Sequence, residues 1–301
     1  MRVFVTGASG WIGSAVVPEL LSAGHHVTGL ARSDKSAAAI EASGAASVRG
    51  SIEDLDLLRA AAAGSDAVIH LAFPVELALA GNIEEAVAVD VVTIKTLGEG
   101  LRPGGTIAVA SATVGLAQDG VVATERDEAP PGALVALRKP SDHAALALSA
   151  HGLRPVVVRL PPTSHGEGDN GFIPSLIETA RNCGFSGYPA DGAARWSAVH
   201  VRDTARLFRI AVETEVTGYL HAVAEEGISL REIAEAIGRH LDMRTRSVPV
   251  DRIDEHFGWV APFLKADSPV SSAITRETCD WRPTELSLLD DLGEGHYFAK
   301  A

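Results

Sequence analysis

Three glycines at three-residue spacing are the clearest chemical signal in the sequence. They follow a strand-like run and open an amphipathic pattern. Gly7 would permit a tight turn, Gly10 would let the backbone approach a pyrophosphate, and Gly13 would let helix and strand pack closely. A glycine triplet alone also suits an ordinary turn. Its place between a strand and a helix favours a dinucleotide-binding loop, in which we expect the cofactor-binding residues Thr6, Gly7, Ser9, Gly10, Trp11, Ile12 and Gly13.

The end of the second strand-like run bears on the choice between NADP and NAD. It reads Ala31-Arg32-Ser33-Asp34, where an NAD-binding protein usually carries a carboxylate for the ribose hydroxyls. A guanidinium at Arg32, beside Ser33, suits a 2′-phosphate. In the alternative, Arg32 is a solvated charge and Asp34 binds the ribose. We therefore expect NADP as cofactor, with NAD as the alternative.

These residues lie in a regular alternation of strand-like and helical segments. Apolar runs of strand length occupy residues 3–6, 26–31, 67–72, 106–110 and 156–160. Helical patterns over residues 12–21, 54–63, 84–101 and 141–151 separate them, each followed by glycine or by Pro-Gly. Such alternation is typical of βαβ units. It predicts an α/β fold with a Rossmann-type, doubly wound parallel sheet.

A second region begins after Leu160, where glycines interrupt every segment. It has helices of its own: Ser229 and Glu232 form a capping-box pattern before an apolar helix that runs to about Leu241. This region predicts a smaller C-terminal α+β lobe, without a linker long enough to let it move freely.

Composition excludes several classes of partner. Among 301 residues, 26 Lys and Arg face 39 Asp and Glu without a basic cluster, so we expect no nucleic-acid or membrane partner. Cys183 and Cys279 show no metal or disulfide spacing, and His70 has no second histidine at metal spacing. We expect no metal. No secretory signal or membrane-span pattern is present, which predicts a cytoplasmic protein.

The chain resembles the extended branch of the short-chain dehydrogenase/reductase superfamily, the NAD-dependent epimerase/dehydratase-like proteins. The likeness rests on residues 6–13, 66–72, 110–115, 124–130, 158–161, 195–203 and 280–283. It implies a dinucleotide-binding domain of residues 1–162, to which 196–222 return, and a substrate lobe of 163–195 and 223–301. It also implies a homodimer paired through the helices at 84–101 and 141–151. Further cofactor contacts are implied at Ser51, Ile52, Leu71, Ala72, Phe73, Ala110, Lys139, Leu160 and Pro161.

The resemblance further implies a catalytic serine, tyrosine and lysine, the last two spaced Tyr-x-x-x-Lys. Ser111 occupies the serine position, but Val135 stands where the phenol belongs, with Lys139 as the lysine. A one-residue shift would pair Leu134 with Arg138 instead. The phenol normally exchanges a proton with the substrate oxygen. Its absence is a departure from the family, as are Asp90 in place of an asparagine and Ser51 in place of an acid.

Other side chains would have to replace the phenol. We expect Ser111 and Thr113 as hydrogen-bond donors and Lys139 as a positive charge. His165 follows the sixth strand at the edge where open α/β sheets bind ligands, and is the acid/base candidate unless it is a solvated loop residue. His200 is a second candidate, although a buried structural role is favoured.

The chain has only three tyrosines that could replace the missing phenol. Tyr219 and Tyr297 are expected to be structural, whereas Tyr188 lies in the glycine-rich lobe and would need a loop to bring it over the cofactor. Substrate contacts are expected from Phe172, Tyr188 and Trp196, which equally suit a core.

The residues and the resemblance together predict an NADP-dependent oxidoreductase of the atypical, extended type. It would move a hydride between NADP(H) and a small carbonyl or alcohol, without a tyrosine. Two alternatives stay open. One is a sugar epimerase or dehydratase; the other is a non-catalytic NAD(P)-binding sensor or scaffold, which would tolerate loss of the phenol.

Overall fold

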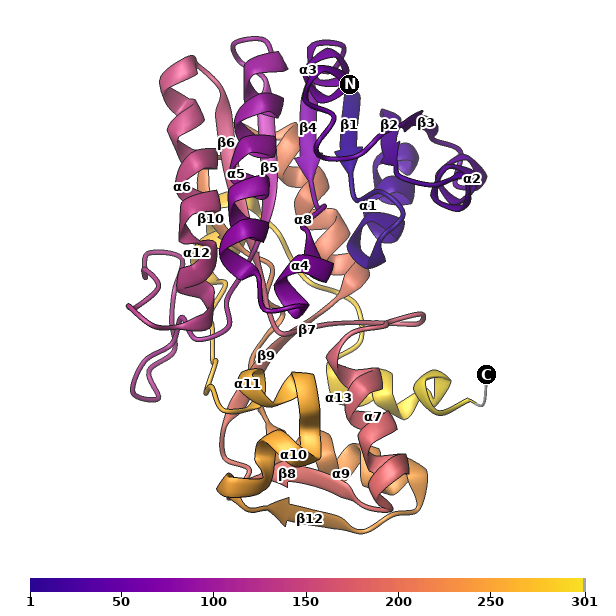
Figure 1. The fold of residues 1–301 in the computed structure, drawn as a ribbon, viewed down its shortest axis with the longest axis vertical. Helices are drawn as coiled ribbons and strands as arrows, with labels where there is room; N and C mark the ends of the chain where they lie inside the picture. Colours follow the sequence, from indigo (N-terminus) through magenta and orange to yellow (C-terminus); the bar gives the residue numbers. More distant parts are fainter. Residues whose placement is uncertain (300–301) are drawn as a thin grey trace.

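The computed structural model describes residues 1–299 and contains a seven-stranded parallel sheet of order β10-β6-β5-β4-β1-β2-β3 (Figure 1). The order reverses at β1, as in a doubly wound fold. The predicted fold class is thus confirmed. The strands are β1 (Arg2–Thr6), β2 (His26–Ala31), β3 (Ala46–Arg49), β4 (Ala67–His70), β5 (Thr106–Ala112), β6 (Arg154–Leu160) and β10 (Gly218–His221).

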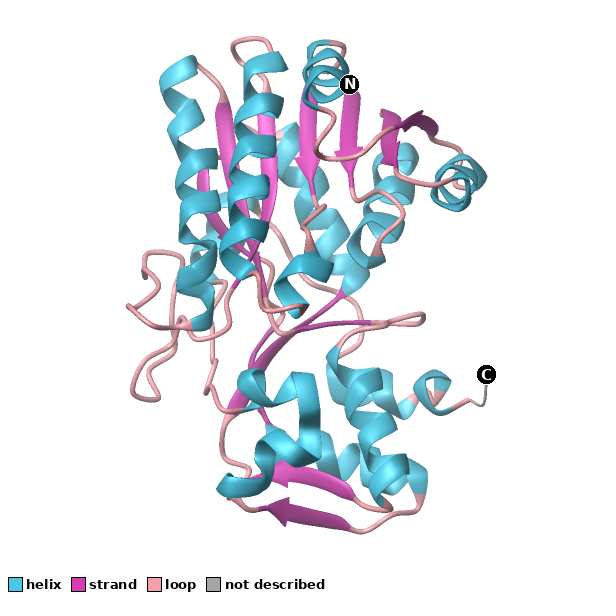
Figure 2. Cartoon of the chain, viewed as in Figure 1, coloured by secondary structure: helices cyan, strands magenta, loops and turns pink. Residues whose placement is uncertain are grey.

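Helices cover both faces of this sheet (Figure 2). On one face lie α1 (Trp11–Ser22) and α8 (Val201–Glu213), whose apolar stripes include Val16, Leu20 and Phe208. On the other lie α3 (Leu55–Ala63), α5 (Ile83–Gly100) and α6 (Lys139–Ala147). The short helices α2 (Asp34–Ala42) and α4 (Val75–Leu79) follow β2 and β4. A 3₁₀ turn, η1 (Leu134–Arg138), leads into α6, and η2 (Leu148–His151) follows it.

The second lobe has a separate apolar core. It is built from α7 (Phe172–Cys183), α9 (Leu230–Leu241), α10 (Ile253–Phe257), α11 (Ala261–Leu264) and α13 (Leu288–Gly293), with the strand pair β8 (Ser186–Pro189) and β12 (Thr245–Val248). A three-stranded sheet of β7 (Thr163–His165), β9 (Arg195–His200) and β11 (Glu225–Ser229) runs between the lobe and the main sheet (Figure 1). The segments η3 (Val250–Arg252), η4 (Gly258–Val260), α12 (Ala273–Cys279) and η5 (His296–Phe298) complete the described chain.

Several elements begin or end at other residues than the sequence predicts. The strand expected at 67–72 ends at His70, because Leu71 to Phe73 turn away over the glycine loop. The helix expected at 141–151 starts at Lys139 and finishes as 3₁₀. β3 is an edge strand without a fully buried residue, which explains why no apolar run marks it.

Two further observations concern residues 1–299 only. None of their helices has the length and apolarity that a membrane crossing needs. Their His, Cys, Asp and Glu side chains form no group of three or more that could hold a metal ion, and both cysteines are free.

Candidate functional site

The glycine loop is a tight cradle between β1 and α1. Gly7 has φ of +69°, and a Cβ there would lie 2.8 Å from the Ala72 nitrogen. A Cβ on Gly13 would lie 2.1 Å from the Gly7 carbonyl oxygen, whereas one on Gly10 would meet only that oxygen, at 3.2 Å. Gly7 and Gly13 are therefore required by the protein's own packing. Gly10 is exposed and packs against little, so its missing side chain leaves room above the loop.

The helix that follows offers free amides at this opening. Gly10 is the N-cap of α1, no side chain caps the helix, and its first turn carries no acidic residue. Uncapped N–H groups and the helix dipole attract an anion. The residues present therefore fit the pyrophosphate of a dinucleotide. Trp11 ties the loop to the second lobe, because its Nε1 donates to the Ser164 carbonyl oxygen at 2.7 Å.

The residues predicted to select between NADP and NAD lie on the surface beyond β2. The Arg32 guanidinium contacts Glu76 Oε1 at 3.2 Å, and both side chains are more than 70% exposed. Ser33 caps α2 in a capping box with Ser36. Asp34 lies in the first turn of that helix and contacts Arg49 at 3.5 Å. Arg32 is thus held by a weak surface pair that a ligand anion could replace.

A row of polar side chains crosses one face of the sheet at the carboxyl ends of its strands. Thr6 pairs with His70 across β1 and β4, and Ser111, Arg159 and His221 pair in turn across β5, β6 and β10. The residues two positions before them are apolar and pack under α3, α5 and α6. Because side chains alternate along a strand, the polar row continues this face beyond its apolar core.

One part of this row is a continuous hydrogen-bonded chain. Thr6 Oγ1 and His70 Nδ1 are 2.7 Å apart, and His70 Nε2 lies 3.0 Å from Asp90 Oδ1. The other Asp90 oxygen lies 3.4 Å from Arg138 Nη2, which also donates to the Ala110 carbonyl oxygen at 3.1 Å. Burial alone would raise the pKa of Asp90, but the hydrogen bond from His70 and the charge of Arg138 hold it below its ordinary value.

The other part of the row surrounds Ser111. Asp142, in the first turn of α6, is buried beside Ser111 and lies 3.9 Å from Arg159 Nε. Burial raises the pKa of Asp142, against the opposing charge of Arg159. Ser111 Oγ and Thr113 Oγ1 are buried and have no hydrogen-bond partner within the described residues. The Arg159 guanidinium lies 3.5 Å from the centre of the Tyr219 ring.

Lys139 and Arg138, the two candidates for the lysine position of Tyr-x-x-x-Lys, point in different directions. Lys139 Nζ contacts Glu128 at 2.6 Å at the surface. Arg138 points inward to Asp90 and stacks over Phe73, with 3.8 Å from its Cζ to the ring centre. Val135 is buried in a small apolar cluster with Leu116 and Val270. The structure thus brings Arg138, not Lys139, to the carboxyl edge of β5.

His165 is buried, not a solvated loop residue. It lies in β7 with no exposed surface, and its Nδ1 contacts Asp291 Oδ2 of α13 at 2.8 Å. Its Nε2 has no partner within residues 1–299. His200 packs edge-on against it with ring centres 5.3 Å apart, and accepts a hydrogen bond from the Arg202 amide as the N-cap of α8. Burial and the nearby His165 lower the pKa of His200. No hydrogen bond in the described chain joins His165 to Ser111.

The aromatic candidates are distributed through the second lobe. Trp196 is fully buried, and its Nε1 donates to the Phe263 carbonyl oxygen, so it belongs to the lobe's core. Tyr188 lies in β8 at the far end of the lobe, beneath Arg231, and cannot stand over the cofactor loop from there (Figure 1). Phe172 is partly exposed and stacks on the half-exposed Trp259, with ring centres 5.2 Å apart.

The remaining predicted contacts lie around the same edge of the main sheet. Ser51 and Ile52 follow β3, where the Ser51 amide donates to Asp54 Oδ2 at 2.6 Å and the Ile52 carbonyl accepts from Thr93. Leu71, Ala72 and Phe73 follow β4 and are partly buried. Ala110 ends the apolar part of β5, and the Leu160 carbonyl accepts from the Thr113 amide at 2.9 Å before the buried Pro161.

Sequence reasoning did not assign Asp90, Arg138, Asp142, Arg159 or Asp291 to the site. All five are charged, and all of them except Arg138 are buried. Charged residues are rarely buried without a partner, so charges within apolar or helical segments were the sequence signal that could have identified them.

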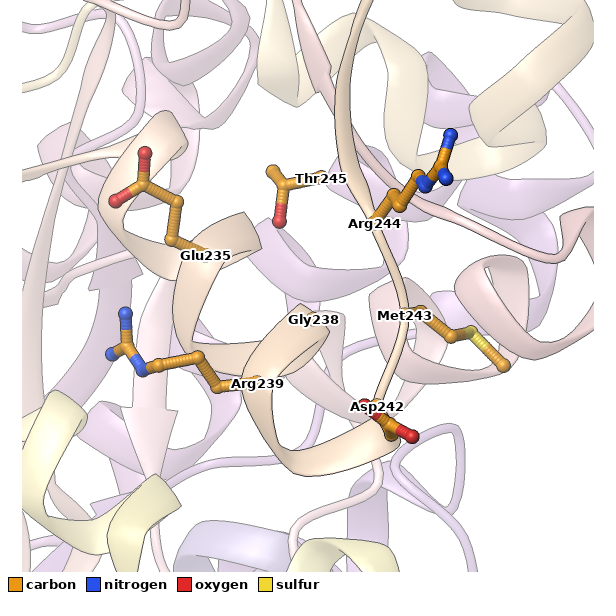
Figure 3. A pocket seen from close by; sticks show the side chains of 7 residues that line it. All are labelled: Glu235, Gly238, Arg239, Asp242, Met243, Arg244 and Thr245. Atoms are coloured by element: carbon orange, nitrogen blue, oxygen red, sulfur yellow. The ribbon is translucent and has the colours of Figure 1, made fainter.

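A hollow of about 490 Å³ in the second lobe contains none of the predicted residues (Figure 3). It is lined by Glu235, Gly238, Arg239, Asp242, Met243, Arg244 and Thr245.

Several known proteins are similar to this chain over much of its length. An uncharacterized protein of Schizosaccharomyces pombe is 42% identical over 99% of this chain and 100% of its own length. An uncharacterized protein of Saccharomyces cerevisiae is 39% identical over 97% and 98%. A 4-hydroxy-2-methyl-3-oxo-4-farnesyl-3,4-dihydroquinoline-1-oxide ketoreductase of Stigmatella aurantiaca is 26% identical over 75% of this chain and 68% of its own.

Solved structures share the fold. The human epimerase family protein SDR39U1, crystallised with NADPH, has a TM-score of 0.79 at 22% identity, over 99% of this chain and 100% of that one. The dTDP-glucose 4,6-dehydratase DesIV of Streptomyces venezuelae, crystallised with NAD, has a TM-score of 0.78 at 23% identity, over 98% and 96%. The sequence model of the NAD dependent epimerase/dehydratase family matches residues 3–221. This chain therefore belongs to the NAD dependent epimerase/dehydratase family.

Proposed function

We propose that the protein is an NADP(H)-dependent oxidoreductase that interconverts a small carbonyl compound and its alcohol. The observation that carries the proposal is the cradle formed by Gly7, Gly10 and Gly13 at the uncapped N-terminus of α1. It offers a dinucleotide pyrophosphate free amides and no side chain in its path. The similarity to a named ketoreductase over 75% of the chain supports the reaction class.

The residues around the loop suggest how the cofactor would be held. Thr6, Ser9 and Gly10 would lie along the pyrophosphate, and Leu71 to Phe73 would flank the dinucleotide at the edge of β4. Arg32 would exchange Glu76 for the 2′-phosphate of NADP. The bound nicotinamide would supply or accept the hydride at the substrate carbon.

The chain must then manage charge on the substrate oxygen without a tyrosine. All three tyrosines are accounted for: Tyr188 at the far end of the lobe, Tyr219 beneath Arg159, and Tyr297 bonded to Gly166 and Asp169. We assign hydrogen bonding to Ser111 and Thr113 and proton exchange to His165. Lys139, which the resemblance implies as the positive charge, contacts Glu128 at the surface instead. The buried positions of Ser111, Thr113 and His165 require side-chain movement when substrate binds.

A sugar epimerase or dehydratase is the second candidate, favoured by the family and by the fold of the DesIV enzyme. The third is a non-catalytic NAD(P)-binding protein, favoured by the burial of Val135 at the expected place of the phenol. An oxidoreductase changes the oxidation state of the cofactor and the substrate together, with net turnover of NADP(H). Neither alternative predicts such a net change.

A paired experiment separates these functions. NADPH and NADH are titrated into the protein by fluorescence, and a panel of ketones and aldehydes is then tested for oxidation of the bound cofactor. We expect tighter binding of NADPH and oxidation by at least one carbonyl compound. Binding without oxidation by any member of the panel would contradict the oxidoreductase and favour the sensor. Conversion of a nucleotide sugar without net oxidation would favour the epimerase.

A further inference from the structure

A continuous set of close polar contacts runs from Thr6 through His70 and Asp90 to Arg138. The Asp90 carboxylate only accepts, so His70 Nε2 must carry a proton. Thr6 Oγ1 accepts from the Ala72 amide at 3.3 Å and can donate its own proton to His70 Nδ1. His70 thus links the Thr6 hydroxyl to the Asp90 carboxylate. The other Asp90 oxygen faces the Arg138 guanidinium, with 3.4 Å from Oδ2 to Nη2.

This arrangement holds the Arg138 guanidinium rigidly while leaving donors free. Its Nη2 is bound to Asp90 and to the Ala110 carbonyl, and its flat face lies on Phe73. Its Nε is buried without a hydrogen-bond partner, and within residues 1–299 the guanidinium hydrogen bonds involve Nη2 and not Nη1. A guanidinium has five N–H donors in a fixed plane. Arg138 therefore retains unused donors beside Phe73, at the junction of β4 and β5.

Arg138 also differs from the enclosed polar groups around it by its partial exposure. Its side chain is 18% exposed. Ser111 Oγ and Thr113 Oγ1 are enclosed, Asp90 is fully buried, and Lys139 turns outward to Glu128. Arg138 therefore combines hydrogen bonds to the buried Asp90 and to the Ala110 carbonyl with a partly exposed side chain, whereas Lys139 contacts a surface residue.

We propose that Arg138 binds the substrate's carbonyl oxygen and stabilises the negative charge that develops there, with Asp90 as its positioning residue. The inference rests on the proposed oxidoreductase function. In reduction, the carbon gains a hydride and the electron pair of the C=O π bond moves to the oxygen, opposite the guanidinium. The oxygen then takes a proton from water, directly or through His165, and becomes the alcohol. Arg138 keeps its own protons throughout, because its pKa is too high for it to act as an acid.

The test uses variants that separate charge, geometry and anchoring. Arg138→Leu removes the donors, and Arg138→Lys keeps the charge but loses the planar fork. We expect kcat to fall at least ~100-fold in Arg138→Leu, as for loss of an oxyanion donor, and less in Arg138→Lys. Guanidinium ion at concentrations far below denaturing ones should partly restore turnover in Arg138→Ala. Arg252→Leu, which removes an exposed arginine of the second lobe, is the control.

Asp90→Asn tests the positioning role. It keeps a hydrogen-bond partner for Arg138 but removes the charge, so we expect a smaller fall in kcat with little change in KM. The His70 Nε2–H resonance in ¹H–¹⁵N spectra should shift in Asp90→Asn and not in Arg252→Leu. A merely structural Arg138 would lower thermal stability in every variant and would not respond to guanidinium.

The outcomes distinguish this inference from the function on which it rests. Unchanged kcat in Arg138→Leu, with a parent protein that oxidises NADPH, would overturn the role of Arg138 and leave the oxidoreductase intact. A parent that binds NADPH but turns over no carbonyl compound would overturn both. Loss of NADPH binding in Arg138→Leu equal to its loss of turnover would reassign Arg138 to the cofactor.

Discussion

Gly13 faces the Gly7 carbonyl oxygen so closely that a Cβ on Gly13 would lie 2.1 Å from it. The same oxygen accepts the Gly10 amide at 2.9 Å. The turn is therefore closed on itself by Gly7 and Gly13, and it is open to ligand at Gly10. Gly7 and Gly13 are thus required by the packing of the turn, whereas Gly10 leaves the space that we expect a ligand to use.

This division predicts opposite effects for two substitutions. Gly13→Ala should lower the free energy of unfolding by about 1–3 kcal/mol or more, because backbone atoms cannot yield to the new methyl group. Gly10→Val should cost less stability than Gly13→Ala, because its Cβ would lie 3.2 Å rather than 2.1 Å from the Gly7 carbonyl oxygen, but it should weaken NADPH binding at least ~10-fold, about 1.4 kcal/mol. Chemical denaturation and fluorescence titration measure the two effects. Gly293→Ala is the control, since a Cβ there would touch nothing within 4 Å. Parent-like NADPH affinity in Gly10→Val would remove the loop from the binding site.

Cofactor preference should depend on the surface pair of Arg32 and Glu76. Arg32→Ala should weaken NADPH binding by about 1.5–3 kcal/mol, roughly tenfold or more, with little effect on NADH. Glu76→Gln should strengthen NADPH binding, because it removes a competitor for Arg32 and a repulsive charge. Titration of both cofactors into all three proteins checks this. The same NADPH-to-NADH ratio in each would show that Arg32 does not contact the 2′-phosphate.

The glycine loop and the parallel sheet could be predicted from the sequence, because residues close together in the chain determine them. Strand, glycine turn and amphipathic helix define the loop within eight residues, and the alternation of elements predicts the sheet. Arg138 could not be assigned in this way, because spacing permits either Val135 with Lys139 or Leu134 with Arg138. The decision comes from tertiary structure: η1 directs Val135 into an apolar cluster and Arg138 toward Asp90, which belongs to a different helix.

Burial of His165 was unpredictable for a similar reason. Its partner Asp291 lies 126 positions later, in the second lobe. A glycine-rich surrounding predicts a surface loop, but β7 pairs with β9 and α13 covers it. Trp196 differs, because its strand-like context already suited a core.

Stability should depend on pH through His221. Burial lowers the pKa of His221 to about 4, against the opposing effect of its hydrogen bond to the Ser271 carbonyl at 2.8 Å. The unfolded chain binds a proton near pH 6.5, which the folded protein excludes until about pH 4. The free energy of unfolding should thus be unaffected above pH 6.5 and fall below it, by up to roughly 3 kcal/mol near pH 4.

His221→Asn isolates this effect, because an amide can still donate to Ser271. Denaturation curves at several pH values should show a weaker loss of stability on acidification for His221→Asn than for the parent. His151→Asn, at an exposed position, should follow the parent. Identical acid slopes in all three proteins would contradict a neutral, buried His221.

Homodimerisation through α5 and α6 remains a prediction of the sequence. Ala88 and Val92 are exposed one turn apart on α5, and Val92 is 46% exposed. If a second copy covers this stripe, Val92→Glu should convert a dimer to a monomer in light scattering at micromolar concentration. Leu286→Glu, at an equally exposed leucine, should leave the dimer intact. A monomeric mass for the parent would exclude the interface.

The roles of Ser111 and His165 can be separated from their structural contacts by the choice of substitution. Ser111→Ala should lower turnover while leaving NADPH affinity unchanged, because we assign the Ser111 hydroxyl to the substrate and not to the cofactor. It should also leave stability unchanged, because this hydroxyl has no hydrogen-bond partner within the described residues. His165→Ala would leave Asp291 without its 2.8 Å partner and should cost stability as well as turnover. His165→Asn keeps a donor for Asp291 but removes the free ring nitrogen. We therefore expect stability close to that of the parent and turnover as low as in His165→Ala, measured by steady-state kinetics beside thermal unfolding. Parent-like turnover in His165→Asn would restrict His165 to holding α13 against β7, and proton exchange would then have to come from water alone.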